Sequence, residues 1–190
     1  MDFPEHPFWD FALRVYRSPG VSAACLEVQE RLGLDVNVLL FCCWLGASGR
    51  GAVPRTTLVR ARDSVATWHE SVVKHLRSVR RALKDGIASA PPELAQALRA
   101  QIQAREIDAE HIEQLMLAAS VAALVVKARA TDDERVDDAV ANVGTYVQSL
   151  GVAATGADRA ALGCIVAAAF PGQQREPIEA RLSNLALAGL

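Results

Sequence analysis

The amino-acid sequence predicts an all-α protein, a single-domain helical bundle of about seven to eight helices, and three observations support this prediction. Apolar residues recur at helical spacing in nearly every segment. Helix start and stop signals divide these segments. No pair of alternating apolar runs flanks a hairpin turn. At 190 residues the chain can bury one core, so we expect one domain over 1–190, with an aromatic-rich part at 8–84 and an Ala/Leu-rich part at 93–190.

Three short helices are expected at the N-terminal end. The first spans about 7–17, with a proline in its first turn and a Ser-Pro-Gly stop after it. The second spans about 21–32 and ends at Gly33, a residue that tolerates the left-handed conformation. The third spans 36–45 behind the N-cap residue Asp35. Because this third helix is apolar on all sides, it should be the central helix.

Two longer amphipathic regions follow. The first, over 56–84, combines an apolar stripe with a basic one. The second begins near Glu93 and either reaches Arg129 or breaks near Glu106. Its apolar residues are expected to face inward: Leu94, Leu98, Ile102, Ile112, Leu115, Ala119 and Ala122.

The C-terminal part shows two further helix starts. Thr131 and Glu134 form a capping box, and the helix behind them should run to Leu150. Thr155 with Asp158 is a weaker start signal, for a helix that ends near residue 170. A last helix is expected over 177–187.

Composition excludes some classes of protein. Although 51% of the residues are hydrophobic, no apolar run reaches the roughly 18 residues that a membrane span requires. The N-terminal sequence MDFPEHP is acidic where a secretory signal is basic, so we expect a cytoplasmic protein with no membrane contact. The cysteines lack metal-site spacing and should be structural, so neither a metal site nor a cofactor is predicted: Cys25, Cys42, Cys43 and Cys164.

A resemblance to a known family rests on several motifs. These are FWDF at 8–11, SPGV at 18–21, CL at 25–26, GLDVN at 33–37, LLFC at 39–42 and WLG at 44–46, with Trp68 and the segment from Val72 to Lys84 after them. The sequence resembles a bacterial family of small uncharacterised proteins over residues 8–84. The resemblance implies a helical fold and no particular activity.

The first candidate site is a polar set within the aromatic-rich part. Asp10 and Arg14 are four residues apart and can pair on one helix face. Asp35 and Asn37 lie at a helix start, where free amide groups can bind an anion or be capped by Asp35 itself. The set is either caps and a surface pair, or a polar pocket near two tryptophans. The candidate ligand-binding residues are Trp9, Asp10, Arg14, Asp35, Asn37 and Trp44.

The second candidate is a basic region. Residues 50–84 contain nine basic and two acidic side chains, a net charge of +7, in a chain with a net charge of −2. The basic helix could face acidic helices of the same chain, remain solvated, bind an acidic protein partner, mediate self-association, or bind nucleic acid. The candidate partner-binding residues are Lys74, Arg77, Arg80, Arg81 and Lys84.

Other motifs are explained without chemistry. Asp133 and Asp137 form a DxxxD pair that suits a helix N-terminus. Asp108, Glu110, His111 and Glu113 form half of a di-iron motif, and we interpret them as a solvated helix face. The glycines of GASGRG lack the lysine of a phosphate loop, and there is no GxSxG motif for a nucleophilic serine.

The sequence therefore favours a non-enzymatic helical protein that binds a macromolecular partner through the basic helix. The alternative is a small-molecule binder or enzyme with a pocket at the aromatic and polar cluster. Nucleic-acid binding is the weakest of the three, because the chain is acidic overall and no aromatic residues alternate with the arginines.

Overall fold

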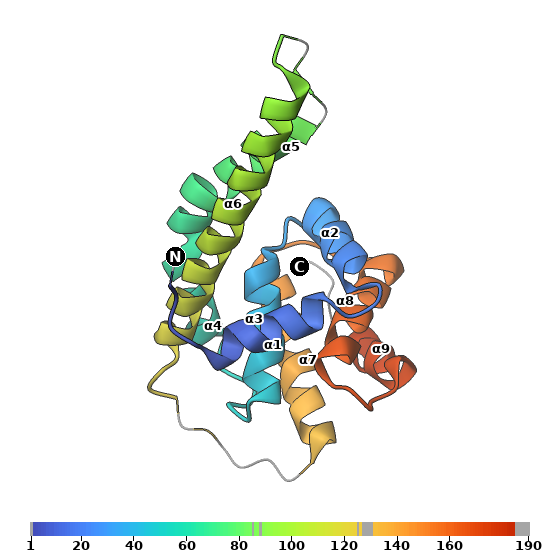
Figure 1. Cartoon of the computed structure of the whole chain (residues 1–190). Coiled ribbons are helices and arrows are strands. Elements are labelled where there is room, and N and C mark those ends of the chain that lie inside the picture. The colour runs from blue at the N-terminus through green and yellow to red at the C-terminus, as the bar shows by residue number, and fades with distance from the viewer. Residues whose placement is uncertain (1, 85, 88, 125, 127–130, 185–190) are drawn as a thin grey trace.

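The computed structural model describes residues 2–84, 86–87, 89–124, 126 and 131–184. Within these residues the protein is all-α, as predicted. The elements are α1 (Pro7–Tyr16), α2 (Val21–Leu32), α3 (Val36–Ala47), α4 (Arg55–Trp68), the π-helical turn η1 (His69–Val73), α5 (Lys74–Lys84), α6 (Pro92–Ser120), α7 (Asp132–Ser149), α8 (Gly156–Ala169) and α9 (Arg175–Asn184) (Figure 1). Because α4, η1 and α5 form one continuous helix, the described residues make eight helices.

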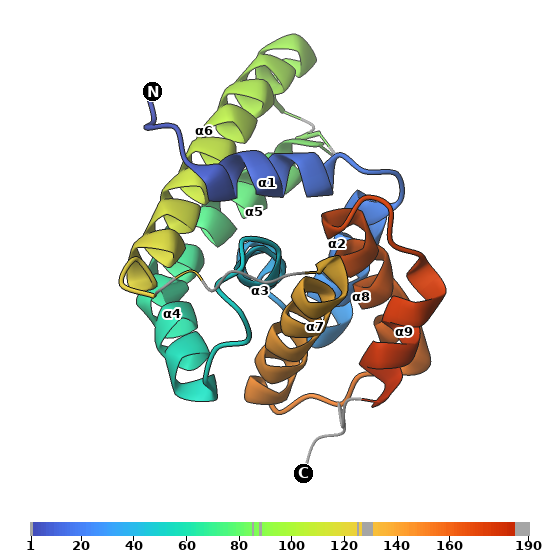
Figure 2. The same cartoon turned by 90° about the horizontal axis from the view of Figure 1, so that it is seen from below.

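Helix α3 is the centre of the bundle, as its apolar sequence predicts. It is seen end-on in Figure 2, with other helices around it. Every residue from 37 to 46 is buried. It packs most closely on α7, where a side chain at Gly46 would place a Cβ atom 2.6 Å from the backbone nitrogen of Ala139. Only glycine permits this approach of the two backbones.

The predicted helix ends are confirmed. Asp35 caps α3 by accepting a hydrogen bond from the amide of Asn37, and Gly33 ends α2 with a φ of 66°. Thr131 and Thr155 each open a helix with a complete capping box. Helix α6 runs unbroken to Ser120. The predictions that this helix reaches Arg129 or breaks near Glu106 are both wrong, because residues 121–124, which the structure describes, are not helical. The predicted end of the last helix over 185–187 lies outside the described residues.

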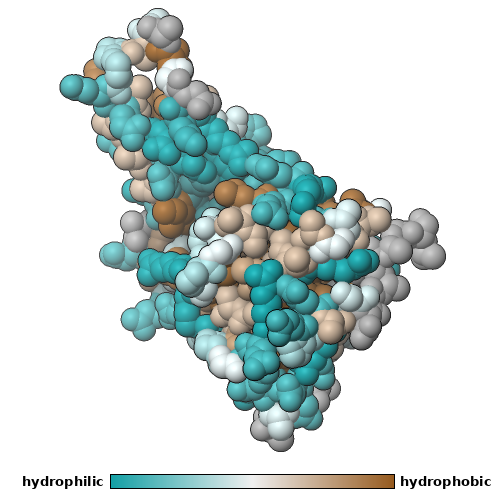
Figure 3. All heavy atoms as spheres, turned by 90° about the vertical axis from the view of Figure 1, so that its right-hand side faces the viewer, coloured by the Kyte–Doolittle hydropathy of each residue, from teal (hydrophilic) through white to brown (hydrophobic). Residues whose placement is uncertain are grey.

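The continuous helix α4–η1–α5 and helix α6 lie antiparallel, and the far end of this hairpin projects beyond the rest of the molecule (Figure 1). On the face shown in Figure 3, hydrophilic side chains cover most of the projecting part.

The predicted inward face of α6 is wrong. Leu94 is 69% exposed and Leu98 is 47% exposed, because they lie on the projecting half, where no second layer covers them. The half of α6 that meets α1, α3 and α4 buries a largely polar face instead: Glu106, Ala109, His111, Glu113, Gln114, Leu117 and Ala118. Buried polar groups need partners, and the helices around α6 supply them for Glu106, Glu113 and the amide nitrogen of Gln114.

The structure bears on two further predictions, the absence of a membrane span and the structural role of the cysteines. Among the described residues, no helix combines the length and the apolar character that a membrane crossing requires. Cys25, Cys42 and Cys43 are buried, consistent with a structural role.

Candidate functional site

Three polar side chains from distant parts of the sequence meet beside α3. Asp35 precedes α3, His69 begins η1 and Glu113 lies in the inner half of α6. The Nδ1 atom of His69 lies 3.1 Å from Oδ2 of Asp35 and 3.1 Å from Oε1 of Glu113. The Glu113 side chain is completely buried, while those of His69 and Asp35 are 14% and 13% exposed. We call Asp35, His69 and Glu113 the acidic–histidine cluster.

A local irregularity of the helix accompanies the position of His69. At η1 the chain makes a π-type turn, in which the amide of Lys74 donates to the carbonyl of His69. Such turns are rare and occur frequently at functional sites. Just before the turn, the indole N–H of Trp68 donates to the carbonyl of Ala109, at 3.0 Å. This bond ties the end of α4 to α6 next to Glu113.

A second layer of hydrogen bonds orients the carboxylates. The side-chain amide nitrogen of Asn37 donates to Oε2 of Glu113 at 2.8 Å. Its side-chain oxygen, Oδ1, accepts a hydrogen bond from Gln114 at 2.8 Å. The backbone amide of Asp35 donates to the hydroxyl of Tyr146 at 2.8 Å. Partners of this kind hold ligating or catalytic carboxylates in one orientation.

The electrostatics of the cluster are those of closely packed titratable groups. Burial, with the neighbouring Glu113 carboxylate, raises the pKa of Asp35 well above its usual range. Burial acts against a charged His69, but the hydrogen bond to Glu113 and the two carboxylates outweigh it, so the pKa of His69 is raised. Perturbed pKa values such as those of Asp35 and His69 mark candidate functional sites.

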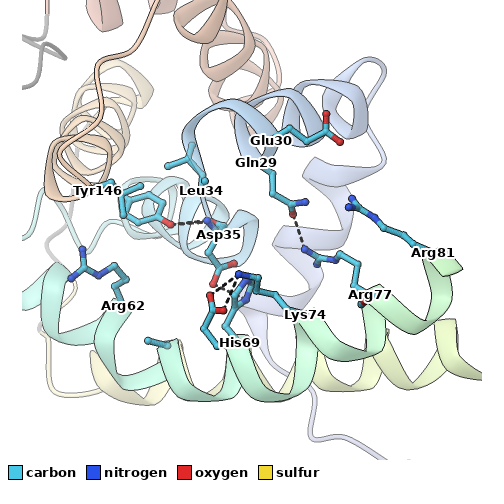
Figure 4. A pocket seen from close by; sticks show the side chains of 15 residues that line it. Gln29, Glu30, Leu34, Asp35, Arg62, His69, Lys74, Arg77, Arg81 and Tyr146 are labelled. Atoms are coloured by element: carbon cyan, nitrogen blue, oxygen red, sulfur yellow. Dashed lines mark hydrogen bonds and ion pairs between the residues drawn. The ribbon is translucent and has the colours of Figure 1, made fainter.

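The cluster opens onto a pocket of about 520 Å³ between α2 and the continuous helix α4–η1–α5. Asp35 and His69 lie in the middle of this pocket, Arg62 lies toward one end, and Arg77 and Arg81 lie toward the other (Figure 4). The lining residues are Gln29, Glu30, Gly33, Leu34, Asp35, Arg62, Ala66, His69, Glu70, Lys74, Arg77, Ser78, Arg81, Tyr146 and Leu150. The volume suits a small molecule.

The six predicted ligand-binding residues do not form one site. Asp35 and Asn37 belong to the acidic–histidine cluster and its hydrogen-bond layer. Asp10 and Arg14 do not join them: Arg14 donates to the carbonyls of Ala168 and Ala169 at the end of α8. Asp10 and Arg14 instead line a separate surface pocket with Leu13, Arg17 and Ser18.

The two predicted tryptophans are also placed away from the pocket. Trp9 stacks on the ring of His111, with the ring centres 3.9 Å apart. Trp44 is buried against Phe8, and the guanidinium of Arg50 lies over its ring. Both tryptophans contribute to packing in this structure.

The interpretation of residues 108–113 as a solvated face is wrong for two of them. His111 is 6% exposed and Glu113 is fully buried, since this half of α6 lies against α1 and α3. His69 and Glu113 are site residues that were not predicted from the sequence. One signal was present: Glu106, Glu110, Glu113 and Leu117 follow helical spacing along a single face.

Residues of the predicted basic stripe have partners within the chain. Arg77 pairs with Glu106 at 3.0 Å and with Glu110 at 2.6 Å, and Arg80 also pairs with Glu106. Lys74 pairs with Glu70. Arg81 lines the pocket, and Lys84 is exposed near the projecting end of the hairpin. Arg77 and Arg80 therefore fit the alternative in which the basic helix faces an acidic helix of the same chain.

The DxxxD pair of α7 faces a basic residue. Arg181 of α9 lies 3.1 Å from Asp133 and 3.2 Å from Asp137. These acids therefore join two helices, in addition to lying in or next to the first turn of α7.

The fold and the site together define an all-α protein with a partly buried histidine and two carboxylates beside a pocket. The chain belongs to the DUF2390 family, described as proteins of unknown function, whose family model matches residues 7–117. The sequence resemblance to an uncharacterised family is therefore confirmed, and the match includes all three residues of the cluster. Comparisons with curated proteins and with solved structures gave no match.

Proposed function

We propose that this protein is a metal-dependent enzyme that binds one divalent transition-metal ion at Asp35, His69 and Glu113 and acts on a small molecule in the adjoining pocket. The observation that carries the proposal is the convergence of three ligand-type atoms, all within 4.8 Å of one another, beside a pocket that Asp35 and His69 line. It departs from the sequence analysis, which predicted no metal and favoured a non-enzymatic role.

The spacing of the three atoms supports a metal. When a metal binds nitrogen and oxygen at about 2.0–2.2 Å, neighbouring ligand atoms lie about 3.0–3.4 Å apart. Nδ1 of His69 is 3.1 Å from each carboxylate oxygen. A hydrogen bond has a similar length, but one ring N–H shared between two carboxylates makes two bent, weakened hydrogen bonds. A shared cation satisfies all three groups and removes the repulsion between the carboxylates.

The types of ligand indicate which metals fit. One imidazole and two carboxylates suit Zn²⁺, Mn²⁺, Fe²⁺ or Co²⁺, whereas Ca²⁺ and Mg²⁺ prefer oxygen ligands alone. Three protein ligands leave coordination positions open, as in catalytic rather than structural sites. Since Asp35 and His69 line the pocket, the open positions would face a bound molecule. A metal there supplies Lewis acidity to a substrate oxygen or to a water molecule.

Metal titration tests the proposal. The protein is treated with a chelator and titrated with Zn²⁺, Mn²⁺ and Co²⁺ by calorimetry, with bound metal counted by elemental analysis. We expect one ion per chain in the wild type and none at this site in His69→Ala. His75→Ala is the matched control, because His75 is exposed on the same continuous helix and does not line the pocket. Equal metal binding by all three proteins would overturn the proposal.

A second candidate function is the binding of an acidic protein partner, or of a second copy, through the projecting hairpin. It is supported by exposed apolar side chains on that hairpin, among them Val79, Leu94 and Ile107. Capture of partners by the wild type and by Arg77→Glu/Arg81→Glu tests it, and identical partners would count against it. A cytoplasmic location, expected from the sequence, is part of both proposals.

A further inference from the structure

The pocket beside the cluster has basic walls. Four cationic side chains line it, and apart from Asp35 the lining contains two acidic ones, Glu30 and Glu70. A metal ion at the cluster would offset the charges of Asp35 and Glu113, so the excess of positive charge belongs to the walls. Charge of one sign in a concave site attracts ligands of the opposite sign. The cationic residues are Arg62, Lys74, Arg77 and Arg81.

The cations of α5 differ in how firmly they are held. Arg77 is fixed, because Glu106, Glu110 and Gln29 each accept one of its N–H groups, which leaves two of its five donors for a ligand. Lys74 pairs only with Glu70, in a surface ion pair that contributes little and can open. Arg81 has no hydrogen bond or ion pair with any other residue that the structure describes.

The three cations of α5 lie at increasing distances from the cluster along the helix axis. Lys74, Arg77 and Arg81 follow His69 by five, eight and twelve residues, which places them about 8, 12 and 18 Å further along the axis at 1.5 Å per residue. The spacing of these three residues keeps them on one side of the helix, and all three line the pocket. In Figure 4 this side faces Gln29 and Glu30 of α2.

We infer that the molecule bound in this pocket is a small anion, whose phosphate or carboxylate group is held by Arg77, Arg81 and Lys74 and whose other end reaches the acidic–histidine cluster. The inference rests on the proposed function, since it supplies the substrate class of that site. Guanidinium groups present paired N–H donors that match the oxygen atoms of both acid groups. In this inference the basic residues of segment 50–84 that line the pocket bind its ligand. Lys84 does not line the pocket and takes no part in binding.

Anion titration tests the inference. The full chain, with and without bound Zn²⁺, is titrated with inorganic phosphate and separately with succinate at low salt. We expect binding that is about tenfold weaker in Arg81→Gln, at the low end of the contribution of charge-assisted hydrogen bonds. Lys84→Gln is the matched control and should bind like the wild type. Glu30→Gln should bind more tightly, because it removes negative charge from the wall.

The outcomes separate this inference from the proposed metal site. If phosphate binding persists in His69→Ala and weakens in Arg81→Gln, the anion site exists whether or not the metal does. If phosphate binding depends on His69 but not on Arg81, phosphate is only a metal ligand and the inference is overturned. The absence of binding by either anion overturns it as well and leaves the metal titration unaffected. The stronger of the two probes identifies the acid group.

Discussion

Asn37 is the residue that holds the cluster in place from outside. It is 6% exposed, donates to Glu113 and accepts from Gln114, and its backbone amide donates to the carboxylate of Asp35. Asn37 is recognisable in the sequence as a polar residue in the first turn of an apolar helix. Its partners on α6 are not, because they lie 76 and 77 positions away. Such pairings follow from helix packing and not from local pattern.

Replacement of Asn37 by alanine should weaken both stability and metal binding. Glu113 loses a buried donor, which costs about 1–3 kcal/mol of unfolding free energy. Metal affinity should fall roughly 10–100-fold, as is usual when a second-layer partner is removed. Urea unfolding and calorimetric metal titration measure the two effects. Asn142→Ala is the control. Asn142 is also buried, but it bonds to Val53, Gly51 and Cys42 and to no residue of the cluster, so this variant should lose stability without losing metal affinity.

Glu106 gives a pH-dependent prediction at the same scale. Burial disfavours its charge, but ion pairs with Arg80 and Arg77 outweigh burial and lower its pKa below the ordinary 4.5, while Glu110 lies nearby with a raised pKa. A lowered folded-state pKa stabilises the protein above the unfolded value, and this stabilisation is lost as the pH falls through the folded pKa. Glu106→Gln should therefore be about 1–3 kcal/mol less stable than the wild type at pH 7.

The difference between Glu106→Gln and the wild type should stay constant down to about pH 5 and shrink below it, because protonated Glu106 resembles glutamine. Urea unfolding across this range measures the difference. Glu93→Gln serves as the control, since Glu93 is exposed at the start of α6. A constant difference at all pH values would contradict the assignment.

At the scale of elements, the π-turn η1 divides one long helix into two halves that pack against different neighbours. Helix α4 packs on α6 and α7, whereas α5 packs on α6, and side chains of both halves line the pocket. The periodicity of the sequence predicted a single helix over 56–84, and the continuous helix confirms it. The extra residue in the turn was not predictable, because an i→i+5 bond leaves no signature in residue type.

Addition of one residue to the turn should separate fold from function. Because the π-turn already holds one extra residue, an alanine inserted after the exposed Ser71 rotates everything after it by about 100° relative to α4. His69 and the α5 cations would then no longer face the same pocket. We expect helical content by circular dichroism close to the wild type, lower stability and no metal binding at the cluster. Ser71→Ala, which preserves the length, should bind metal normally.

For the whole molecule, the cluster brings together three segments that are far apart in the sequence. Residues 35, 69 and 113 belong to three elements, and the hairpin that carries two of them meets the rest of the bundle mainly through α1, α3 and α7. A cation at the cluster would fasten the hairpin to the central helix. It binds the folded state alone, so it should stabilise the protein as a whole.

Metal addition should therefore raise the melting temperature and protect particular regions. At a free metal concentration 100 times its dissociation constant, the unfolding free energy should rise by about 2.7 kcal/mol. Under native conditions, hydrogen exchange should slow at the start of α3, in η1 and in the inner half of α6, with little change in exposed α9. His69→Ala should show neither effect. Uniform protection in both proteins would indicate metal binding elsewhere.

The sequence by itself determined the helices, their caps and the central place of α3. These features depend on interactions between residues a few positions apart, such as Thr131 with Glu134, or on an apolar run that can only be buried. The tertiary structure alone decided that Asp35 meets His69 and Glu113, that Arg14 bonds to the end of α8, and that α6 buries charge. The physical reason is that buried polar groups are stabilised by partners distant in sequence, which only the packing of helices brings within reach.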